Sequence, residues 1–231
     1  MKPVLQLRGV ELRRGGFVLR VPRLAVPAGR VTCLVGPNGV GKTSLLLAAA
    51  GLLDLAAGEV LLDGARLHAG RAPAPLAPRR RVGLVFQEPY LFSSSLAANL
   101  AYPLRLRGVA RAERRRRVAA MLQRVGLAGR GRQRADSLSG GQRRLAALGR
   151  ALLCRPRALL LDEVYAGLDE AACARVDALL EELLADGVAL LAATHEPGRP
   201  RADAADVIAL RVGAAVDDRR TATGETAGGS S

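Results

Sequence analysis

A glycine-rich loop between a strand-like segment and a helix-like segment constrains the fold of this chain more than any other feature. The loop follows the apolar run Val31–Val35, leads into the apolar residues 43–50, and reads Gly36, Pro37, Asn38, Gly39, Val40, Gly41, Lys42, Thr43. Glycines at this spacing let successive backbone N–H groups point at phosphate oxygens, and the first turn of a following helix adds positive potential. A strand, a phosphate-binding loop and a helix in this order predict an α/β fold with a parallel sheet.

Lysine usage points to the same loop. The formal net charge is +14, with 35 lysines and arginines, yet the only lysines are Lys2 and Lys42. A lysine ammonium is a compact point charge that fits between phosphate oxygens, whereas the guanidinium of arginine is a planar fork. We therefore expect Lys42 to reach the β- and γ-phosphates of ATP and the Thr43 hydroxyl to hold Mg²⁺ between them, with Ser44 in the same site.

Three motifs in a fixed order carry a family resemblance. The pentapeptide Leu138, Ser139, Gly140, Gly141, Gln142 follows the loop and ends 20 residues before the carboxylates Asp162 and Glu163. A phosphate loop alone fits many nucleotide-binding proteins, but this combination resembles the ATP-binding cassette (ABC) ATPases over roughly residues 4–213. The resemblance implies a P-loop NTPase core with a parallel sheet, an N-terminal antiparallel β subdomain and an α-helical subdomain that bears the pentapeptide.

The resemblance also implies chemical roles for single residues. Asp162, at the end of the apolar run Ala158–Asp162, would lie beside Mg²⁺, and Glu163 would polarise the attacking water, which needs a base within hydrogen-bond reach. Gln87 resembles the glutamine whose side chain approaches both Mg²⁺ and that water. His195 resembles the histidine that contacts the γ-phosphate. The implied catalytic residues are Glu163, His195 and Gln87, and the implied metal ligands are Thr43, Gln87 and Asp162.

The pentapeptide is expected to act on a second molecule of ATP. Ser139, Gly140 and Gly141 open a helix, so a hydroxyl and backbone N–H groups can bind a phosphate, and Gln142 completes the motif. In the ABC ATPases this phosphate belongs to ATP held by the loop of another subunit. The resemblance thus implies a second ATPase subunit, expected to form a homodimer that encloses two ATP molecules and closes when ATP is bound.

Periodicity places further elements around these motifs. Residues 4–12, 17–26 and 59–62 are expected to form antiparallel strands, and residues 82–86 a further strand. Residues 158–162 and 188–194 are expected to form buried parallel strands, separated by an amphipathic helix at 169–186. Residues 68–81, rich in Pro, Ala and Arg, are expected to form an exposed connection. We expect one ABC ATPase domain at 1–216 with a helical insert at about 95–137, and a disordered tail at 217–231.

The helical insert is strongly basic. Eleven arginines lie between Arg105 and Arg134, and Glu113 is the only acid among them. Nucleic acid and anionic lipid are both candidate partners for such a surface. We favour a solvated helical face beneath a membrane partner over nucleic acid, because no aromatic residues interleave with the arginines to stack on bases.

Two positions depart from the family pattern. Val164 follows Glu163 where the family usually has proline, and valine can adopt the backbone conformation needed there. Arg14 stands where an aromatic residue usually stacks on adenine, with Phe17 nearby. A guanidinium plane can also stack on a base. The sequence therefore leaves open which side chain contacts the adenine.

Apolar segments and the start of the chain bear on where the protein acts. The longest apolar runs are far shorter than the roughly 20 residues that span a bilayer, and Met1 runs into strand-like residues without the features of a signal peptide. We therefore expect a cytoplasmic protein, and the resemblance to the ABC ATPases implies that integral membrane permease subunits hold it on the inner face of the cell membrane.

The predicted function is ATP hydrolysis that drives solute import through the permease. Residues 86–109 look most similar to cassettes of oxyanion importers, of the tungstate, molybdate and phosphate types, so an oxyanion is the expected solute and a substrate-binding protein a further partner. One alternative is the ATPase subunit of an exporter, which shares every catalytic motif. Another is a non-transport ABC ATPase that acts on nucleic acid or ribosomes.

Overall fold

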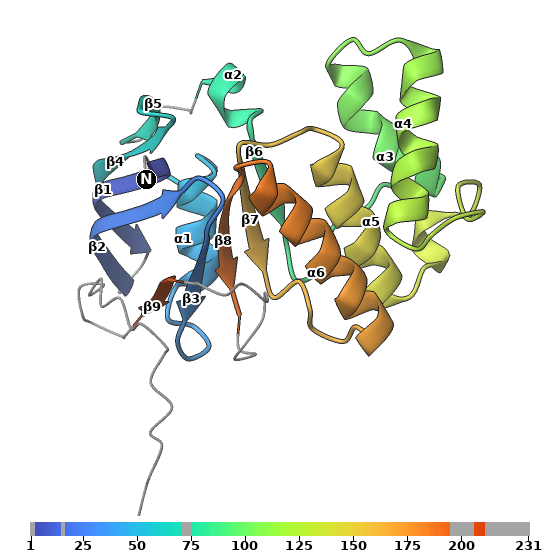
Figure 1. Ribbon diagram of the computed structural model, residues 1–231. Helices are drawn as coiled ribbons and strands as arrows, with labels where there is room; N and C mark the ends of the chain where they lie inside the picture. Colours follow the sequence, from blue (N-terminus) through green and yellow to red (C-terminus); the bar gives the residue numbers. More distant parts are fainter. Residues whose placement is uncertain (1–2, 15–16, 71–74, 195–205, 211–231) are drawn as a thin grey trace, which may run out of the picture.

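Residues 3–14, 17–70, 75–194 and 206–210 are described in this structure, which is a computed structural model. They form two β-sheets with helices packed around them, and helices α3 and α4 lie together at one side (Figure 1). The sequence-based prediction of an α/β fold with one parallel and one antiparallel sheet is confirmed. His195 and the expected tail at 217–231 lie outside the described residues.

A five-stranded parallel sheet forms the centre of the molecule. Its order is β6-β7-β8-β3-β9, with β3 Val31–Val35, β6 Val82–Val85, β7 Ala158–Asp162, β8 Ala189–Ala193 and β9 Asp206–Ala209. Every residue of β7 and β8 is buried, as expected of strands covered on both faces. Along β7, Leu159 and Leu161 join one hydrophobic cluster, whereas Ala158 and Leu160 join the other.

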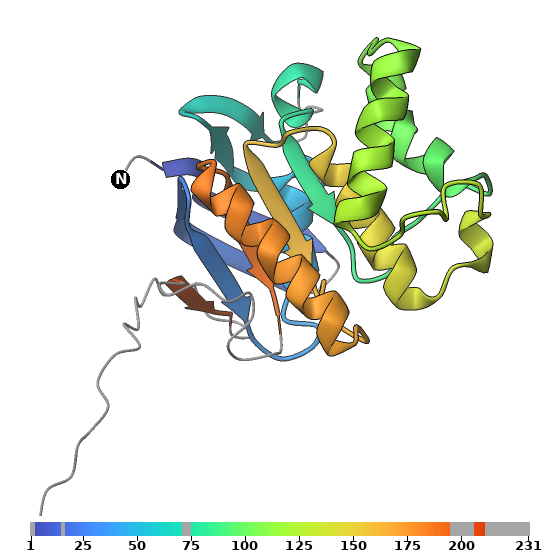
Figure 2. The same ribbon diagram turned by 45° about the vertical axis from the view of Figure 1, so that its right-hand side comes forward.

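Helices cover both faces of this sheet. The helix α6 (Glu170–Ala185) crosses one face, where α5 (Gly140–Leu152) lies beside it, and α1 (Lys42–Ala49) covers the other (Figures 1 and 2). Leu45 and Leu46 of α1 are fully buried in the same cluster as Leu160 of β7. This packing fixes the first turn of α1, and with it the glycine-rich loop, against the end of the sheet.

A four-stranded antiparallel sheet packs beside α1. Its order is β2-β1-β4-β5, with β1 Pro3–Arg14, β2 Phe17–Pro27, β4 Ala57–Leu62 and β5 Ala65–Ala69. The expectation of an exposed connection at 68–81 is wrong at its start, because His68 pairs with Val60 of β4 and is buried. Its ring Nε2 lies 3.0 Å from the backbone oxygen of Leu53. The short helix α2 (Leu76–Arg79) follows before β6.

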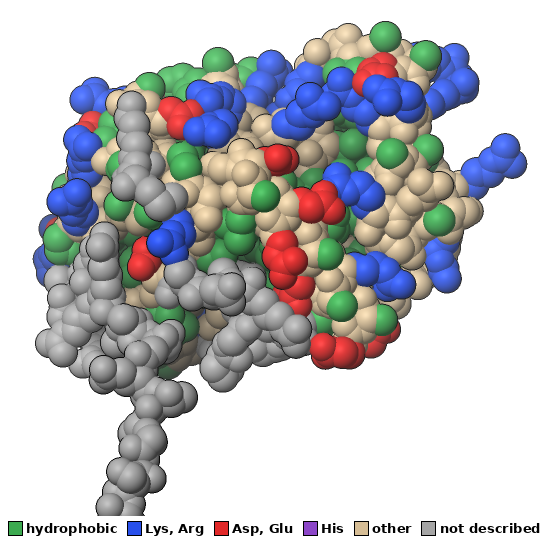
Figure 3. All heavy atoms as spheres, in the orientation of Figure 1, with side chains coloured by type: hydrophobic (Ala, Val, Ile, Leu, Met, Phe, Trp, Pro, Cys, Tyr) green, Lys and Arg blue, Asp and Glu red, His purple; other side chains and the backbone are tan. Residues whose placement is uncertain are grey.

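The helical part of the chain lies between β6 and β7. It comprises α3 (Leu96–Leu106), α4 (Arg111–Arg124), the 3₁₀ turn η1 (Ala135–Ser137) and α5. The helix α4 buries Val118, Met121 and Leu122, and most of its arginines face outward. Figure 3 shows Lys and Arg side chains gathered over α4 along the upper edge of the molecule. Among the helices of the described part, none is both long and apolar enough to cross a membrane.

Candidate active site

The loop that joins β3 to α1 takes a conformation that requires glycine. Gly41 immediately precedes α1 and has a left-handed φ of 104°. A Cβ atom there would lie 2.7 Å from Cζ of Phe17, and one at Gly36 would lie 2.6 Å from the backbone oxygen of Leu210. Neither position has room for a side chain, so this loop conformation requires glycine at both.

Lys42 lies over this loop. Its Nζ donates hydrogen bonds to the backbone oxygens of Gly36 at 2.7 Å and Pro37 at 3.3 Å, and only 8% of the residue is exposed. The two carbonyl groups hold the ammonium group close to the backbone of the loop. An ammonium group and backbone N–H groups at one place can bind the same phosphate group.

Thr43 and Asp162 are 119 residues apart in the sequence and meet in the structure. The Thr43 hydroxyl donates to Oδ2 of Asp162 at 2.7 Å, and Asp162, the last residue of β7, is 5% exposed. Among the described residues, no group of three or more His, Cys, Asp or Glu side chains could hold a metal by itself. One carboxylate beside one hydroxyl fits Mg²⁺, because that ion keeps several waters and takes further oxygens from substrate phosphates.

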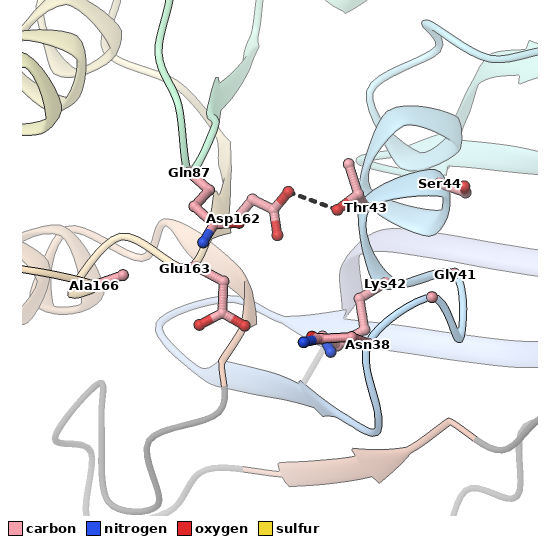
Figure 4. Close-up of a pocket in the computed structure, with 10 residues that line it drawn as sticks. Asn38, Gly41, Lys42, Thr43, Ser44, Gln87, Asp162, Glu163 and Ala166 are labelled. Atoms are coloured by element: carbon pink, nitrogen blue, oxygen red, sulfur yellow. Dashed lines mark hydrogen bonds between the residues drawn. The ribbon is translucent and has the colours of Figure 1, made fainter. Parts of the chain in front are cut away.

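Glu163 turns the chain out of the sheet directly after Asp162. Its φ of 49° is left-handed and strained for a glutamate, and its N–H donates to the backbone oxygen of Ala193 at 3.0 Å. Its carboxylate points into the cleft in a different direction from that of Asp162, which faces Thr43 (Figure 4). Gln87, which follows β6, places its side chain beside Asp162 in the same view.

One cleft of about 510 Å³ brings most of these residues together. Its lining consists of Asn38, Gly39, Gly41, Lys42, Thr43, Ser44, Gln87, Asp162, Glu163 and Ala166. Three loop residues that we expected to bind ATP are not part of this lining. Gly36 and Pro37 accept the hydrogen bonds of Lys42, and Val40 packs into the hydrophobic core with 1% exposed. These three positions shape the loop.

The pentapeptide lies at the start of α5 and faces a different cleft. Ser139 Oγ accepts from the Gln142 N–H at 3.2 Å, and Gln142 Oε1 accepts from the Ser139 N–H at 3.1 Å, which closes a capping box. With Gly140, Gly141 and the segment 167–169, both residues line a cleft of about 430 Å³ that contains no residue of the phosphate loop. The phosphate loop and the pentapeptide therefore line two separate clefts of the same chain.

The strand pair β1–β2 places Phe17, not Arg14, against the phosphate loop. The two residues face each other across the hairpin. The ring of Phe17 is the nearest neighbour of the Cβ position at Gly41, whereas Arg14 is exposed to solvent. Phe17 is therefore the better candidate for a base contact.

Sequence reasoning missed two side chains that lie next to the motifs. Arg144, in the second turn of α5, donates from Nε to the backbone oxygen of Gln87 at 2.9 Å. Tyr165 is 3% exposed and donates its hydroxyl to Oδ1 of Asp177 on α6 at 2.7 Å. The position of Tyr165, two residues after Glu163, could have marked it in the sequence as a residue near the site. No sequence pattern distinguishes Arg144 from the many other arginines.

The fold and the site define a nucleotide-binding domain of the P-loop class. Residues 19–166, more than half of the chain, match the family described as ABC transporter. The chain therefore belongs to the ABC transporter family and contains its ATP-binding domain, as the order of its motifs predicts.

Similar proteins with curated names are import ATP-binding proteins. The chain is 44% identical over 213 residues to the Fe(3+) ions import ATP-binding protein FbpC of Streptomyces coelicolor, with 91% of the chain and 60% of that protein covered. It is 42% identical over 195 residues to the methionine import ATP-binding protein MetN of Thermobifida fusca, with 84% and 60% covered. For the thiamine import ATP-binding protein ThiQ of Cereibacter sphaeroides the identity is 40% over 226 residues, with 95% and 93% covered. The chain thus spans about 60% of the length of the first two relatives.

Solved structures show the same fold. The chain is similar to cbiO1 from Clostridium perfringens, described as part of the ABC transporter complex cbiONQ, with a TM-score of 0.79, 28% identity, and 94% of this chain and 88% of that chain covered. It is also similar to the ATP-binding cassette MJ0796 in a dimeric post-hydrolysis state bound to ADP and phosphate. The TM-score there is 0.76 at 25% identity, with 90% and 94% covered.

Proposed function

We propose that this chain is the ATP-hydrolysing subunit of an ABC transporter that drives solute import through separate membrane subunits. The observation that carries the proposal is the division of the site between two clefts, with the phosphate loop in one and the pentapeptide in the other. Two copies arranged head to tail would join the loop of each to the pentapeptide of its partner. The dimeric state of MJ0796 with ADP and phosphate supports dimerisation of such a domain.

The residues of the first cleft suit phosphoryl transfer to water. Lys42 and the N–H groups of the loop bind the β- and γ-phosphates of ATP. Thr43 and Asp162 are the residues that would hold Mg²⁺, which when bound neutralises charge on those phosphates. Glu163, whose carboxylate points into the cleft, accepts a proton from the attacking water, and Gln87 orients that water.

The second cleft completes the site in the partner copy. Ser139 and the N–H groups of Gly140 and Gly141 open α5 and can bind the γ-phosphate of ATP held by the other subunit. His195, outside the described residues, is proposed to contact the same phosphate of its own chain. ATP then holds the two copies closed, and hydrolysis releases them.

A surface next to Gln87 is proposed to receive the permease. Tyr90 is 71% exposed, and the apolar side chains of Phe92 and Leu106 are exposed as well. The ring centroid of Phe92 lies 5.6 Å from that of Tyr90 and 4.8 Å from that of Tyr102, so the three rings form one cluster. Exposed aromatic clusters of this kind are typical of protein–protein contacts. The outward arginines of α4, which packs on α3, favour a permease segment that carries acidic residues.

Docking on a permease would make the chain peripheral on the inner face of the membrane. The solute is not defined by this chain, since its relatives carry the names of Fe(3+), methionine, thiamine and spermidine/putrescine import proteins. Selection is therefore assigned to the permease and to a proposed substrate-binding protein, and import of an oxyanion stays a prediction. The import names favour an importer over an exporter. A role on nucleic acid has less support, because α4 contains no aromatic residue to stack on bases.

ATP-dependent dimerisation tests the proposal. Glu163→Gln should bind Mg-ATP, hydrolyse it very slowly and accumulate as a closed homodimer. Chromatography with light scattering should then show a shift in mass with ATP and none with ADP. Adding Ser139→Arg should abolish the shift while the variant still binds ATP, because a bulky cation would occupy the phosphate position across the interface.

A matched control adds the same charge elsewhere. Ala112 is exposed on α4, so Ala112→Arg in the Glu163→Gln background should leave the ATP-dependent shift intact. If the variant with Ser139→Arg dimerises normally, the shared site is refuted for this chain, and with it the proposed mechanism.

A further inference from the structure

Arg144 lies where three segments of the chain meet. Its Nε donates a hydrogen bond to the backbone oxygen of Gln87 at 2.9 Å. A Cβ atom at Gly167 would lie 3.4 Å from its Nη1, and one at Gly140 would lie 3.8 Å away. Gly167 belongs to the turn that follows Glu163, and Gly140 belongs to the pentapeptide. One guanidinium therefore lies beside three of the segments that line the two clefts: the segment at Gln87, the turn after Glu163 and the pentapeptide.

The segment after β6 is held to α5 at a second point. Arg150 Nη2 donates to the backbone oxygen of Tyr90 at 2.9 Å. The segment 87–90, together with Gly140, Arg143 and Arg144, lines a cleft of about 460 Å³, so the segment does not pack closely on α5 along its length. Two hydrogen bonds from arginines thus connect its backbone to the helix that begins with the pentapeptide.

These contacts bear on the first cleft because the side chain and the backbone carbonyl of Gln87 face different parts of the molecule. The side chain lies in the first cleft beside Asp162, whereas the carbonyl of the same residue points to Arg144. Gln87 is exposed and lies two residues beyond the end of β6, past the last strand pair of β6 with β7. A hydrogen bond from a charged donor is stronger than a neutral one and restrains the backbone of Gln87.

We infer that Arg144 is a positioning residue: it fixes the backbone of Gln87 to the pentapeptide helix, so that the Gln87 side chain is in place when the pentapeptide meets the partner's ATP. This inference rests on the proposed function. It assigns to Arg144 an effect on hydrolysis that acts through Gln87 and involves no contact with the nucleotide.

A double-mutant cycle on the purified full chain tests this inference. Arg144→Met keeps the aliphatic stem and removes every N–H donor. It should lower kcat about tenfold, equivalent to ~1.4 kcal/mol in the barrier, and change KM for ATP less than about twofold. Arg144→Lys retains a donor within reach and should recover most of kcat. In a Gln87→Ala background, Arg144→Met should have almost no further effect on kcat, because the side chain that Arg144 keeps in place is already absent, although the backbone oxygen that Arg144 contacts remains.

The control is Arg23→Met on an exposed position of β2, which should leave kcat unchanged. Fully additive losses for Arg144→Met and Gln87→Ala would overturn the inference, since Arg144 would then act independently, for example on a phosphate. An unchanged kcat in Arg144→Met, or no recovery with lysine, would also overturn it.

Amide hydrogen exchange measures the restraint on the Gln87 backbone without any ATP hydrolysis. In the chain without nucleotide, Arg144→Met should speed exchange of the amides around residues 87–90 and leave those of β1 unchanged, and equal exchange in both proteins would refute the restraint. If the wild-type chain fails to hydrolyse ATP while this exchange effect is present, the proposed function fails and the positioning of Gln87 stands.

Discussion

Removing one carboxylate should weaken the connection between the two sheets. Asp63 lies in the turn between β4 and β5 and has a left-handed φ of 51°. Arg157, just before β7, donates to Oδ1 at 3.0 Å and to Oδ2 at 3.2 Å, and Arg81, just before β6, donates to Oδ2. Asp63→Asn preserves the shape and tolerates the left-handed backbone, so the change removes the charge and one of the two acceptor oxygens with little change in volume.

The size of the effect follows from exposure and geometry. The side chains of Asp63, Arg157 and Arg81 are 28%, 38% and 49% exposed, so solvent screens both pairs in part. Exposed ion pairs contribute up to ~1 kcal/mol each to the free energy of unfolding, and the bidentate contact of Arg157 with Asp63 is a favourable geometry. We therefore expect Asp63→Asn to lower the free energy of unfolding by ~1–2 kcal/mol at pH 7.

The loss should depend on pH in a defined direction. Hydrogen bonds from the Arg157 guanidinium, with a further contribution from Arg81, hold the pKa of the Asp63 carboxyl below its usual range. A lowered folded-state pKa stabilises the fold fully above the unfolded-state value of ~3.9, and this stabilisation is lost as pH falls through the folded-state pKa. The difference between wild type and Asp63→Asn should thus be constant from pH 7 to about 5 and shrink at lower pH.

Urea unfolding followed by circular dichroism at a series of pH values measures both quantities. Asp54 is an exposed carboxylate in a loop, and Asp54→Asn is the matched control, expected to change stability by less than about 0.5 kcal/mol. A loss at Asp63 no larger than that of the control would refute the link between the sheets. A loss that keeps its full size at the lowest pH would refute its electrostatic origin.

Three further changes test other parts of the structure. Thr32→Val should leave the urea-derived stability unchanged or raise it by up to ~1 kcal/mol, because the buried Thr32 hydroxyl has no hydrogen-bond partner among the described residues; a clear loss would contradict this. Phe17→Ala should weaken ATP binding about tenfold in a fluorescent-nucleotide titration and Arg14→Ala far less, as expected if Phe17 stacks on the base; the reverse ranking would assign the base to Arg14. Tyr165→Phe should cost ~1–3 kcal/mol of stability by removing a donor to the buried Asp177 carboxylate, and Asp177→Leu added to it should recover part of the loss in the same urea assay; equal stability of Tyr165→Phe and wild type would exclude that role.

Much of the candidate nucleotide site could be predicted, because the backbone conformation and the strand burial at its residues depend on neighbours along the chain. The positive φ values at Gly39 and Gly41 can be supplied without strain by glycine, so the loop is visible as spacing alone. The strands β7 and β8 are buried on both faces and read as short apolar runs. Asp162 stands out because a charged residue ends such a run.

Other features gave weak or misleading local signals. His68 was expected in an exposed connection because Pro, Ala and Arg follow it, yet pairing of β5 with β4 buries it. The strand β9, at the edge of the parallel sheet beside β3, had no local pattern that identified it. Arg14 aligned with the family's aromatic position, and only the hairpin between β1 and β2 placed Phe17 against Gly41.

The sequence by itself determined the chemistry of this protein: a phosphate loop with its lysine, a carboxylate pair after a buried strand, and a pentapeptide that opens a helix. Backbone conformation, strand burial and helix capping depend on neighbours along the chain, so residue order records them. Only the tertiary structure decided which of these groups meet. Three features depend on packing between elements far apart in the sequence. They are the contact between Thr43 and Asp162, the position of the pentapeptide in a second cleft, and the hydrogen bond from Arg144 to the backbone of Gln87.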